Sequence, residues 1–502
     1  MKKTPFHEVN VEYGAQMQEL FGYYLPWEYA PGGVEEHIGT RERASLCDLH
    51  YMAEFRIKGP DALTFVQKIL TADADKLKVG QIKYTTMCAE DGNMIDDGTI
   101  WRYGDLEFML IAGDESDCDW IQKNAKGFDV CIENITSDHT TLALQGPKSK
   151  AILKKLSTIN PDTISYYHFT KGEVNGVPCV IARMGYTGES GFEFHFASAH
   201  ARQMWTTIME AGAEFNIVPC GQCALESLRQ EAGYLLVGND HDKNTNPFEA
   251  GIGFTVRFEK KDFNGKQALL NIVKQGVKRR MVWFKLRGGE VVSKGDVISF
   301  DSKKIGEVTS GSYSPTSKTG TAMGYVEPQY AIPSLEVTID SAGKACKGIL
   351  SLVSLYDPGD QKTKVAQKED INELFDNLEV AMVACNPDMK IVYHNKRAAS
   401  FFKLLFNKEN LVGNGLNVCH VPEQLKNIKK LMEDFRSKKK ALSFFMMPDE
   451  NIPGGLVKVV HVPYFKDGEL AGVVEFDFES ALEPGGRDEL KADQRWNPRE
   501  KR

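Results

Sequence analysis

The spacing of hydrophobic residues predicts a mixture of strands and helices in the first half of the chain. Phe55 to Lys58 and Glu107 to Ile111 are predicted strands. The segment 61–70 follows a Gly-Pro turn and is a predicted helix. Residues 198–212 have apolar positions at helical spacing, with Ser198 where an N-cap belongs. The elements mix irregularly, which favours an α+β fold over regular βαβ repeats.

A β-rich segment and a polar break come next. Residues 281–339 alternate apolar and polar side chains between Gly-rich turns, so we expect mostly strands. Asp357 to Lys364 then contains few apolar residues and a Pro-Gly turn. We interpret 357–369 as a linker.

After the linker the pattern predicts a small domain with one sheet and helices on one side. The last residues, 482–502, are polar and densely charged, so we expect a flexible tail. The predicted elements are a helix over 371–378, strands over 380–384 and 391–394, a helix over 422–436, and a final strand pair over 456–463 and 472–478.

Composition narrows the class of protein. A length of 502 residues suggests about three domains. The formal net charge of -8 favours neither nucleic acid nor an anionic membrane as partner. There is no apolar run of about 18 residues and no export signal, so we expect a cytoplasmic protein with its ten cysteines reduced.

One acidic pair could carry chemistry. Asp96 and Asp97 follow a Gly turn and two apolar residues. On a strand they would point to opposite faces, so one could face a pocket while the other meets solvent or caps a turn. A positioned carboxylate can orient an amine or accept its proton. By itself, however, such a pair is more typical of an ordinary turn.

A glycine-rich segment offers a second carboxylate. Glycines at 185, 188 and 191 permit a tight loop before Phe192-Glu193-Phe194. Alternation puts both phenylalanines on one face and Glu193 on the other. Such a carboxylate could accept two parallel hydrogen bonds from a ligand, or it could be a solvated residue on an edge strand. A helix around Leu225 and Leu228 follows, and Gly233 could end it.

Together with their flanks, these motifs resemble one family, the tetrahydrofolate-dependent aminomethyltransferases typified by the T-protein of the glycine cleavage system. The resemblance runs in colinear order over about residues 4–356. The matching segments are Thr4-Pro5-Phe6, Gly22 to Pro26, Asp48 to Met52, Leu142 to Pro147, Gly185 to Glu189, Leu228-Arg229, Glu231-Ala232-Gly233, Gly238-Asn239-Asp240, Ile305 to Gly311, Ser314-Pro315 and Ala322 to Val326.

The resemblance implies a cloverleaf of three domains around a folate channel. It implies a catalytic, folate-binding region over 1–276, built of two intertwined subdomains, and a C-terminal β-barrel over 277–356. The family's essential carboxylate falls on Asp97, beside the folate amine that accepts the one-carbon unit. Its pterin-binding glutamate falls on Glu193. Two further pocket positions fall on Tyr186 and Tyr234, where aromatic rings could contact the pterin.

Several residues differ from the family pattern, and these differences indicate which class of compound donates the one-carbon group. The T-protein has an arginine at the position of Leu225, and a leucine where this chain has Gly98. Its Ser-His-Met is replaced by His50-Tyr51-Met52, so His and Tyr both occur, shifted by one. These changes resemble the branch that demethylates small methoxy or methylthio compounds. We therefore expect Leu225 to contact a methylated substrate.

Removal of a methyl group from an ether leaves an oxyanion that needs a proton or a hydrogen-bond donor. His50, Tyr51 and Tyr24 are the candidates for that role, although a lone His or Tyr is more often an ordinary packing residue. A sulfonium donor would need no acid. Cys220-Gly221-Gln222-Cys223 lacks a second ligand pair, so we expect no metal site there or elsewhere.

The C-terminal domain, residues 370–481, resembles a PAS domain through Asn386 to Asn395, Ala398 and Lys466-Asp467-Gly468. PAS domains bind ligands and often form dimers, so a homodimer through this domain is one candidate assembly. His420 follows Cys419 where some PAS domains hold haem. Dimerisation is the simpler interpretation of this domain, and haem is not its expected ligand.

The sequence thus predicts a folate-dependent transferase that moves a methyl group from a small methylated compound to tetrahydrofolate. Two alternatives stay open. The first is the aminomethyltransferase of the glycine cleavage system, which would dock a lipoylated carrier protein. The second is a folate sensor without turnover that is coupled to the PAS domain.

Overall fold

The computed structural model describes residues 1–357, 362, 380–406, 410–437, 443–448, 456–466 and 469–480. The chain divides into two compact units, Met1–Gln367 and Lys368–Arg502. Apart from residues 357 and 362, the predicted linker lies outside the described residues, and so do the predicted helix over 371–378 and the tail. Among the described helices, none combines the length and apolar character needed to cross a membrane.

A six-stranded sheet forms the centre of the first unit. The face that carries Phe192 and Phe194 packs against the helices α5 and α6 through buried side chains such as Trp205. In spatial order the strands are β11 (Phe169–Val174), β12 (Val177–Ala182), β13 (Gly191–Ala197), β10 (His139–Gln145), β4 (Ser45–Asp48) and β14 (Val218–Cys220), with α5 at Ser149–Leu156 and α6 at Ala201–Gly212.

A second sheet of five strands packs against α3 and α4, with Phe65 and Ile121 among its buried contacts. The strands are β6 (Ile82–Cys88), β7 (Met94–Gly104), β8 (Glu107–Ala112), β5 (Ala53–Lys58) and β9 (Cys131–Asn134), and the helices are α3 (Ala62–Ile69) and α4 (Asp117–Asn124). The two strands and the helix predicted in this region are confirmed.

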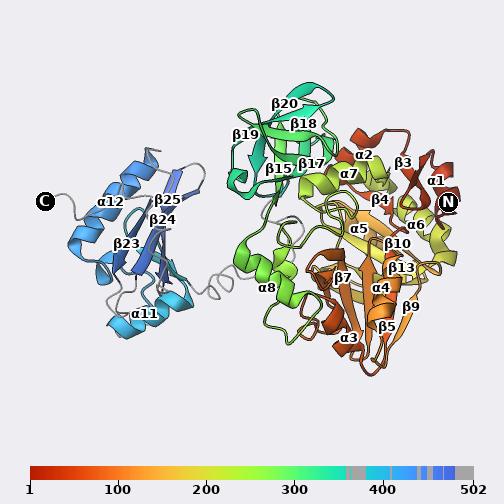
Figure 1. Cartoon of the computed structure of the whole chain (residues 1–502), viewed down its shortest axis with the longest axis horizontal. Coiled ribbons are helices and arrows are strands. Elements are labelled where there is room, and N and C mark those ends of the chain that lie inside the picture. Colours follow the sequence, from red (N-terminus) through yellow and green to blue (C-terminus); the bar gives the residue numbers. More distant parts are fainter. Residues whose placement is uncertain are drawn as a thin grey trace. The chain divides into compact units, whose positions relative to one another are not determined.

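A six-stranded closed barrel completes the first unit, in the β-rich segment that the alternation predicts. Figure 1 shows it beside α7 (Gln222–Ala232), which packs on β17. The strands are β15 (Arg280–Leu286), β18 (Thr319–Val326), β17 (Lys303–Ser314), β16 (Val297–Phe300), β19 (Glu336–Ser341) and β20 (Lys344–Ser351). Because a closed barrel has no free edges, its backbone groups pair internally.

Smaller elements connect these layers. Gly233 ends α7 in a left-handed conformation (φ 78°), as predicted. The remaining elements are β1 (Lys2–Lys3), β2 (Gln16–Leu20), β3 (Tyr23–Glu28), α1 (His7–Glu12), α2 (Gly33–Glu42), α8 (Lys266–Gln275) and 3-10 helices at Pro161–Thr163, Ser198–His200, Ala213–Phe215, Gly253–Thr255 and Pro328–Tyr330.

The predicted N-cap of the helix at 198–212 is wrong. α6 begins at Ala201, and the residue before it, His200, makes no side-chain capping bond. Ser198 lies instead in a 3-10 turn, where its hydroxyl donates to the carbonyl of Ser137 at 3.4 Å. The turn shifts the helix start by three residues, which hydropathy spacing alone does not reveal.

The second unit is one antiparallel sheet with helices packed on it, as predicted. The core joins Val383 and Val473 of the sheet to Met432 and Phe435 of α12. In spatial order the elements are β22 (Ile391–His394), β21 (Ala381–Cys385), β25 (Glu469–Ser480), β24 (Leu456–Lys466) and β23 (Ser443–Pro448), with α11 (Lys396–Phe406), α12 (Pro422–Arg436) and a 3-10 helix at Leu416–Val418. The edge strand β23 was not predicted.

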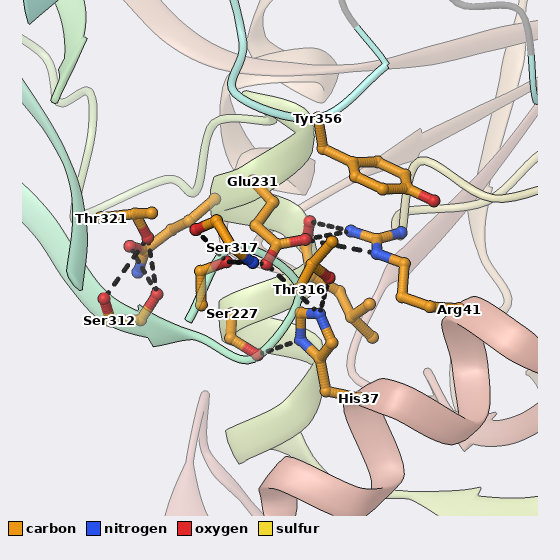
Figure 2. Close-up of polar contacts among 12 residues, drawn as sticks. His37, Arg41, Ser227, Glu231, Ser312, Thr316, Ser317, Thr321 and Tyr356 are labelled. Carbon is orange, nitrogen blue, oxygen red and sulfur yellow. Dashed lines mark hydrogen bonds and ion pairs between the residues drawn. The ribbon is translucent and has the colours of Figure 1, made fainter. Parts of the chain in front are cut away.

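A buried polar network joins α2, α7 and the barrel of the first unit (Figure 2). Glu231 on α7 accepts from Arg41 at 2.8 Å and lies 3.3 Å from the imidazole of His37. His37 also contacts the hydroxyl of Thr316 from the barrel at 2.9 Å, and the ring of Tyr356 covers the Arg41 guanidinium at 3.5 Å. These bonds fix α7 between the barrel and the N-terminal helices.

Candidate functional site

The two sheets of the first unit face one another at the position of the two predicted carboxylates. Trp101 of β7 meets His195 of β13 edge-on, with ring centroids 4.7 Å apart. Asp97 shares a strand face with Trp101, and Glu193 shares one with His195, because side chains alternate with period two. The contact therefore turns the faces that carry Asp97 and Glu193 toward each other.

Asp97 is held by hydrogen bonds from both sides. The hydroxyl of Tyr84, on the neighbouring strand β6, donates to Oδ2 at 2.5 Å, and His241 Nε2 lies 2.6 Å from Oδ1. The side chain keeps 16% of its surface exposed. The carboxylate is therefore fixed in orientation while part of its surface stays accessible to a ligand.

Asp96 does not meet solvent, so the first of the two alternatives for the neighbour of Asp97 is wrong and the second, capping of a turn, stays open. It is 1% exposed and accepts a hydrogen bond from the Gly113 amide at 2.8 Å. Desolvation, followed by the charges of Asp97 and Asp117, raises its pKa well above the usual range. Asp96, Asp97 and His241 bring three possible ligand atoms within 4.8 Å of one another. In this structure Asp97 and His241 bond each other, and Asp96 bonds the Gly113 amide.

His241 is the functional residue that the sequence analysis missed. It directly follows the motif Gly238-Asn239-Asp240 and is 2% exposed. Burial disfavours its charged form, but the hydrogen bond and charge of Asp97 outweigh burial and raise its pKa. Its Nδ1 is buried and has no hydrogen-bond partner among the described residues.

The same histidine lines a cavity of about 530 Å³. The walls come from the loop after α7 and from the barrel, and include Arg279, Lys294, Glu307 and Tyr325. His241 thus connects the carboxylate of Asp97 with a space of the size that binds small molecules.

Glu193 lies on a central strand, which excludes the edge-strand interpretation. It is 7% exposed, and His195 Nε2 lies 3.8 Å from its carboxylate. Glu54 and Thr141 contact the other ring nitrogen of His195, at 3.0 and 2.9 Å. Burial lowers the pKa of His195, but the charge of Glu54 and the contact with Glu193 outweigh burial and raise it to about 9. The imidazolium of His195 therefore lies between the two carboxylates, Glu54 and Glu193.

The structure brings together most of the predicted aromatic residues. Tyr186 and Tyr234 stack with centroids 5.7 Å apart, and the Tyr186 hydroxyl donates to the Leu235 carbonyl. Tyr51 and Leu225 belong to one buried cluster that Tyr186 contacts, and Leu225 is only 3% exposed. These residues form an apolar and aromatic wall.

His50 and Tyr24 lie in different surroundings. His50 is buried, its Nδ1 contacts Thr140 at 3.1 Å, and desolvation lowers its pKa to about 4. Its imidazole is therefore neutral at pH 7. The contacts of Tyr24 are with Glu19 and with the ring of His7, at the outer three-stranded sheet. Neither residue contacts Asp97 or Glu193.

The core of the second unit contains a charged cluster. Glu475 lies 2.7 Å from His461 Nε2 and 3.4 Å from His420 Nε2, and Cys419 contacts His420 Nδ1 at 3.2 Å. The adjoining cavity measures about 10 Å³, enough for one water molecule. Both ring nitrogens of His420 are therefore engaged by neighbouring side chains in this conformation.

Comparison with known proteins assigns both units. The family model for the GCVT N-terminal domain matches residues 6–260, and the model for the glycine cleavage T-protein C-terminal barrel domain matches residues 279–357. A PAS domain model matches residues 371–479.

The relatives cover the first unit. An aminomethyltransferase of Halothermothrix orenii is 40% identical over 351 residues, which is 69% of this chain and 98% of the relative. One from Moorella thermoacetica is 40% identical over 359 residues, 71% and 98% of the two chains. The crystal structure of the glycine cleavage system aminomethyltransferase T from Bartonella henselae superposes with a TM-score of 0.66 at 30% identity, over 70% of this chain and 97% of that one.

Proposed function

Because the chain belongs to the glycine cleavage T-protein family and is a tetrahydrofolate-dependent transferase, we propose that it moves a methyl group from a small methoxy or sulfonium compound to tetrahydrofolate. Asp97 lies beside the folate amine that accepts the methyl group. Glu193 accepts two parallel hydrogen bonds from the pterin, a geometry that suits an ionised carboxylate. The stacked pair of Tyr186 and Tyr234 forms a wall of the site.

The observation that carries this proposal is the environment of Leu225. The family's arginine is absent there, and the leucine lies in a cluster with Tyr51 and Tyr186. An apolar, aromatic surface suits an uncharged methoxyarene, or a sulfonium held against aromatic rings. On such a surface the donor is positioned without a basic side chain.

Aminomethyl transfer from a lipoylated carrier protein is the second candidate. The specific observation in its favour is the 40% identity with aminomethyltransferases over nearly their whole length. A sensor without turnover is the weakest alternative, because the relatives are named as transferases and Asp97 is held for chemistry by two donors.

An assay for folate products distinguishes these candidates. The full chain and tetrahydrofolate are incubated anaerobically with methoxyarenes, sulfonium compounds and methylamines, and separately with the aminomethylated carrier. We expect 5-methyltetrahydrofolate from one donor class, with loss of product in Asp97→Asn. The matched control is Asp105→Asn, which changes a carboxylate that is 87% exposed on the same sheet.

Each other result has a definite meaning. Methylenetetrahydrofolate and ammonia from the carrier alone would establish aminomethyl transfer and refute the demethylase. Folate binding without any product, unchanged in Asp97→Asn, would support the sensor.

The PAS domain provides the proposed assembly. We assign it dimerisation as its simplest use, with no ligand required. Light scattering of the full chain tests this assignment, and a monomer at micromolar concentration would contradict it.

A further inference from the structure

Methyl transfer from an ether requires an acid that the predicted residues do not supply. The departing oxygen takes the bonding electron pair and needs a proton. His50 is neutral at pH 7, and Tyr24 lies at the outer sheet. Tyr51 is buried, and burial raises the pKa of its hydroxyl well above 10, which makes it a weak acid. The structure places a different group beside Asp97.

We propose that His241 is the general acid of the reaction and protonates the oxygen that leaves the methyl donor. The inference deepens the proposed methyl transfer and rests on it. His241 Nε2 stays on Asp97, while Nδ1 donates its proton to the departing oxygen.

The geometry of the ring supports this assignment. The 2.6 Å hydrogen bond between Nε2 and Asp97 fixes the tautomer and orientation of the imidazole. Nδ1 is left without a partner in a side chain that is 2% exposed, an arrangement that costs free energy unless a ligand completes it.

The step balances without a further reactant. The lone pair of folate N5 forms the new N–C bond, and the C–O bond of the donor breaks with its electron pair on oxygen. The N5 proton passes to the Asp97 carboxylate, and the imidazolium of His241 gives its Nδ1 proton to the oxygen. After product release, Asp97 loses one proton to water and His241 gains one. The products are 5-methyltetrahydrofolate and a phenol or alcohol.

The charges around His241 favour its protonated form. Asp97, Asp240 and Asp242 all raise its pKa, against the effect of burial. Asp240 is itself paired with Arg229 at 2.6 Å, so Asp97 is the main counter-ion of His241. The imidazolium form is therefore lost, and activity falls, as the pH rises through the raised pKa of His241.

The test compares donors whose leaving groups differ in their need for a proton. His241→Gln keeps a hydrogen-bond donor for Asp97 at the position of Nε2 but cannot deliver a proton. We expect kcat for methoxyarenes to fall by about 100-fold or more, most for the least acidic phenols. A sulfonium donor leaves as a neutral thioether, so its rate should change little. The alkaline limb of the pH profile should vanish in the variant.

Tyr84→Phe is the matched control, since it removes one hydrogen bond to Asp97 and leaves the acid in place. It should slow all donors alike. An equal loss for all donors in His241→Gln would reduce His241 to a positioning residue and overturn the proposal, as would no loss at all. If the wild-type protein uses no methyl donor, the proposed function fails first and the acid role with it. Calorimetric titration of tetrahydrofolate confirms that each variant still folds and binds.

Discussion

The buried network around Glu231 yields a quantitative prediction about stability. Glu231 is 2% exposed and accepts from Arg41, with His37 at 3.3 Å and a further bond from the Ser314 hydroxyl (Figure 2). Glu231→Gln keeps the shape of the side chain but removes its charge. The guanidinium of Arg41 is then left buried without its main counter-ion.

Two arguments give the same loss in the free energy of unfolding for Glu231→Gln. Removal of one partner from a buried ion pair costs about 3–5 kcal/mol. Independently, burial raises the pKa of Glu231, but the contacts with His37 and Arg41 outweigh burial and lower it to about 2. Compared with the usual 4.5, that corresponds to about 3 kcal/mol in favour of the folded, ionised form. We expect Glu231→Gln to lose about 3 kcal/mol at pH 7.

The same pKa fixes the pH dependence. The contribution of Glu231 is fully present above its unfolded pKa of about 4.5 and is lost as the pH falls through its folded value of about 2. Wild-type protein should therefore lose this stability over that window. The variant should show a flatter dependence there, because an amide does not titrate.

Urea unfolding followed by tryptophan fluorescence measures this effect, since five of the six tryptophans lie before residue 358. The matched control is Glu12→Gln, which removes an exposed ion pair with Arg202 and should cost less than about 1 kcal/mol. A loss below about 1 kcal/mol in Glu231→Gln, or an unchanged slope between pH 4.5 and 2, would refute the reasoning.

Three further predictions concern single residues. Lys260→Met removes the donor for three buried backbone carbonyls, at 2.6 to 2.8 Å, and should cost about 3 kcal/mol in urea unfolding. Gly98→Leu puts a Cβ against the Ile111 carbonyl on β8; β7 must shift, so transfer activity should fall steeply in the folate product assay. His195→Asn removes the cation beside Glu193 and should raise KM for tetrahydrofolate about 10-fold with little change in kcat. In the wild-type protein the charge of His195 stabilises the fold below pH 6.5, and this stabilisation is lost as the pH rises through about 9.

Each of these has a result that would count against it. A stable Lys260→Met would mean that water replaces the ammonium group. An active Gly98→Leu would mean that the strands separate without moving the carboxylate. A fall in kcat rather than a rise in KM for His195→Asn would place the histidine in the chemical step.

Local patterns in the sequence predict the parts of the fold that depend on neighbouring residues. Alternation correctly placed the strand at Phe55 and turned Glu193 away from the phenylalanines beside it. Gly233 ended α7 as its lack of a side chain suggests. The same approach missed β23 and misplaced the start of α6, because a 3-10 turn has no distinct hydropathy pattern.

The site was only partly predictable, because its members come from distant segments. Asp97 and Glu193 could be placed through family motifs. His241 could not be paired with Asp97, since 144 residues separate the two and only the folded chain brings them to 2.6 Å. Nor does the sequence tell which acidic neighbour is buried: Asp96 lies inside because β7 turns it toward the Gly113 amide.

The network in Figure 2 also constrains how the protein is made. His37 bonds Thr316, which follows it by 279 residues. At about 5–20 residues per second, a ribosome needs roughly 15 to 60 s to add that length. During this time His37 lacks its partner Thr316. The N-terminal helices therefore wait for the end of the first unit, and a nascent chain stalled before residue 316 would expose them to chaperones and proteases.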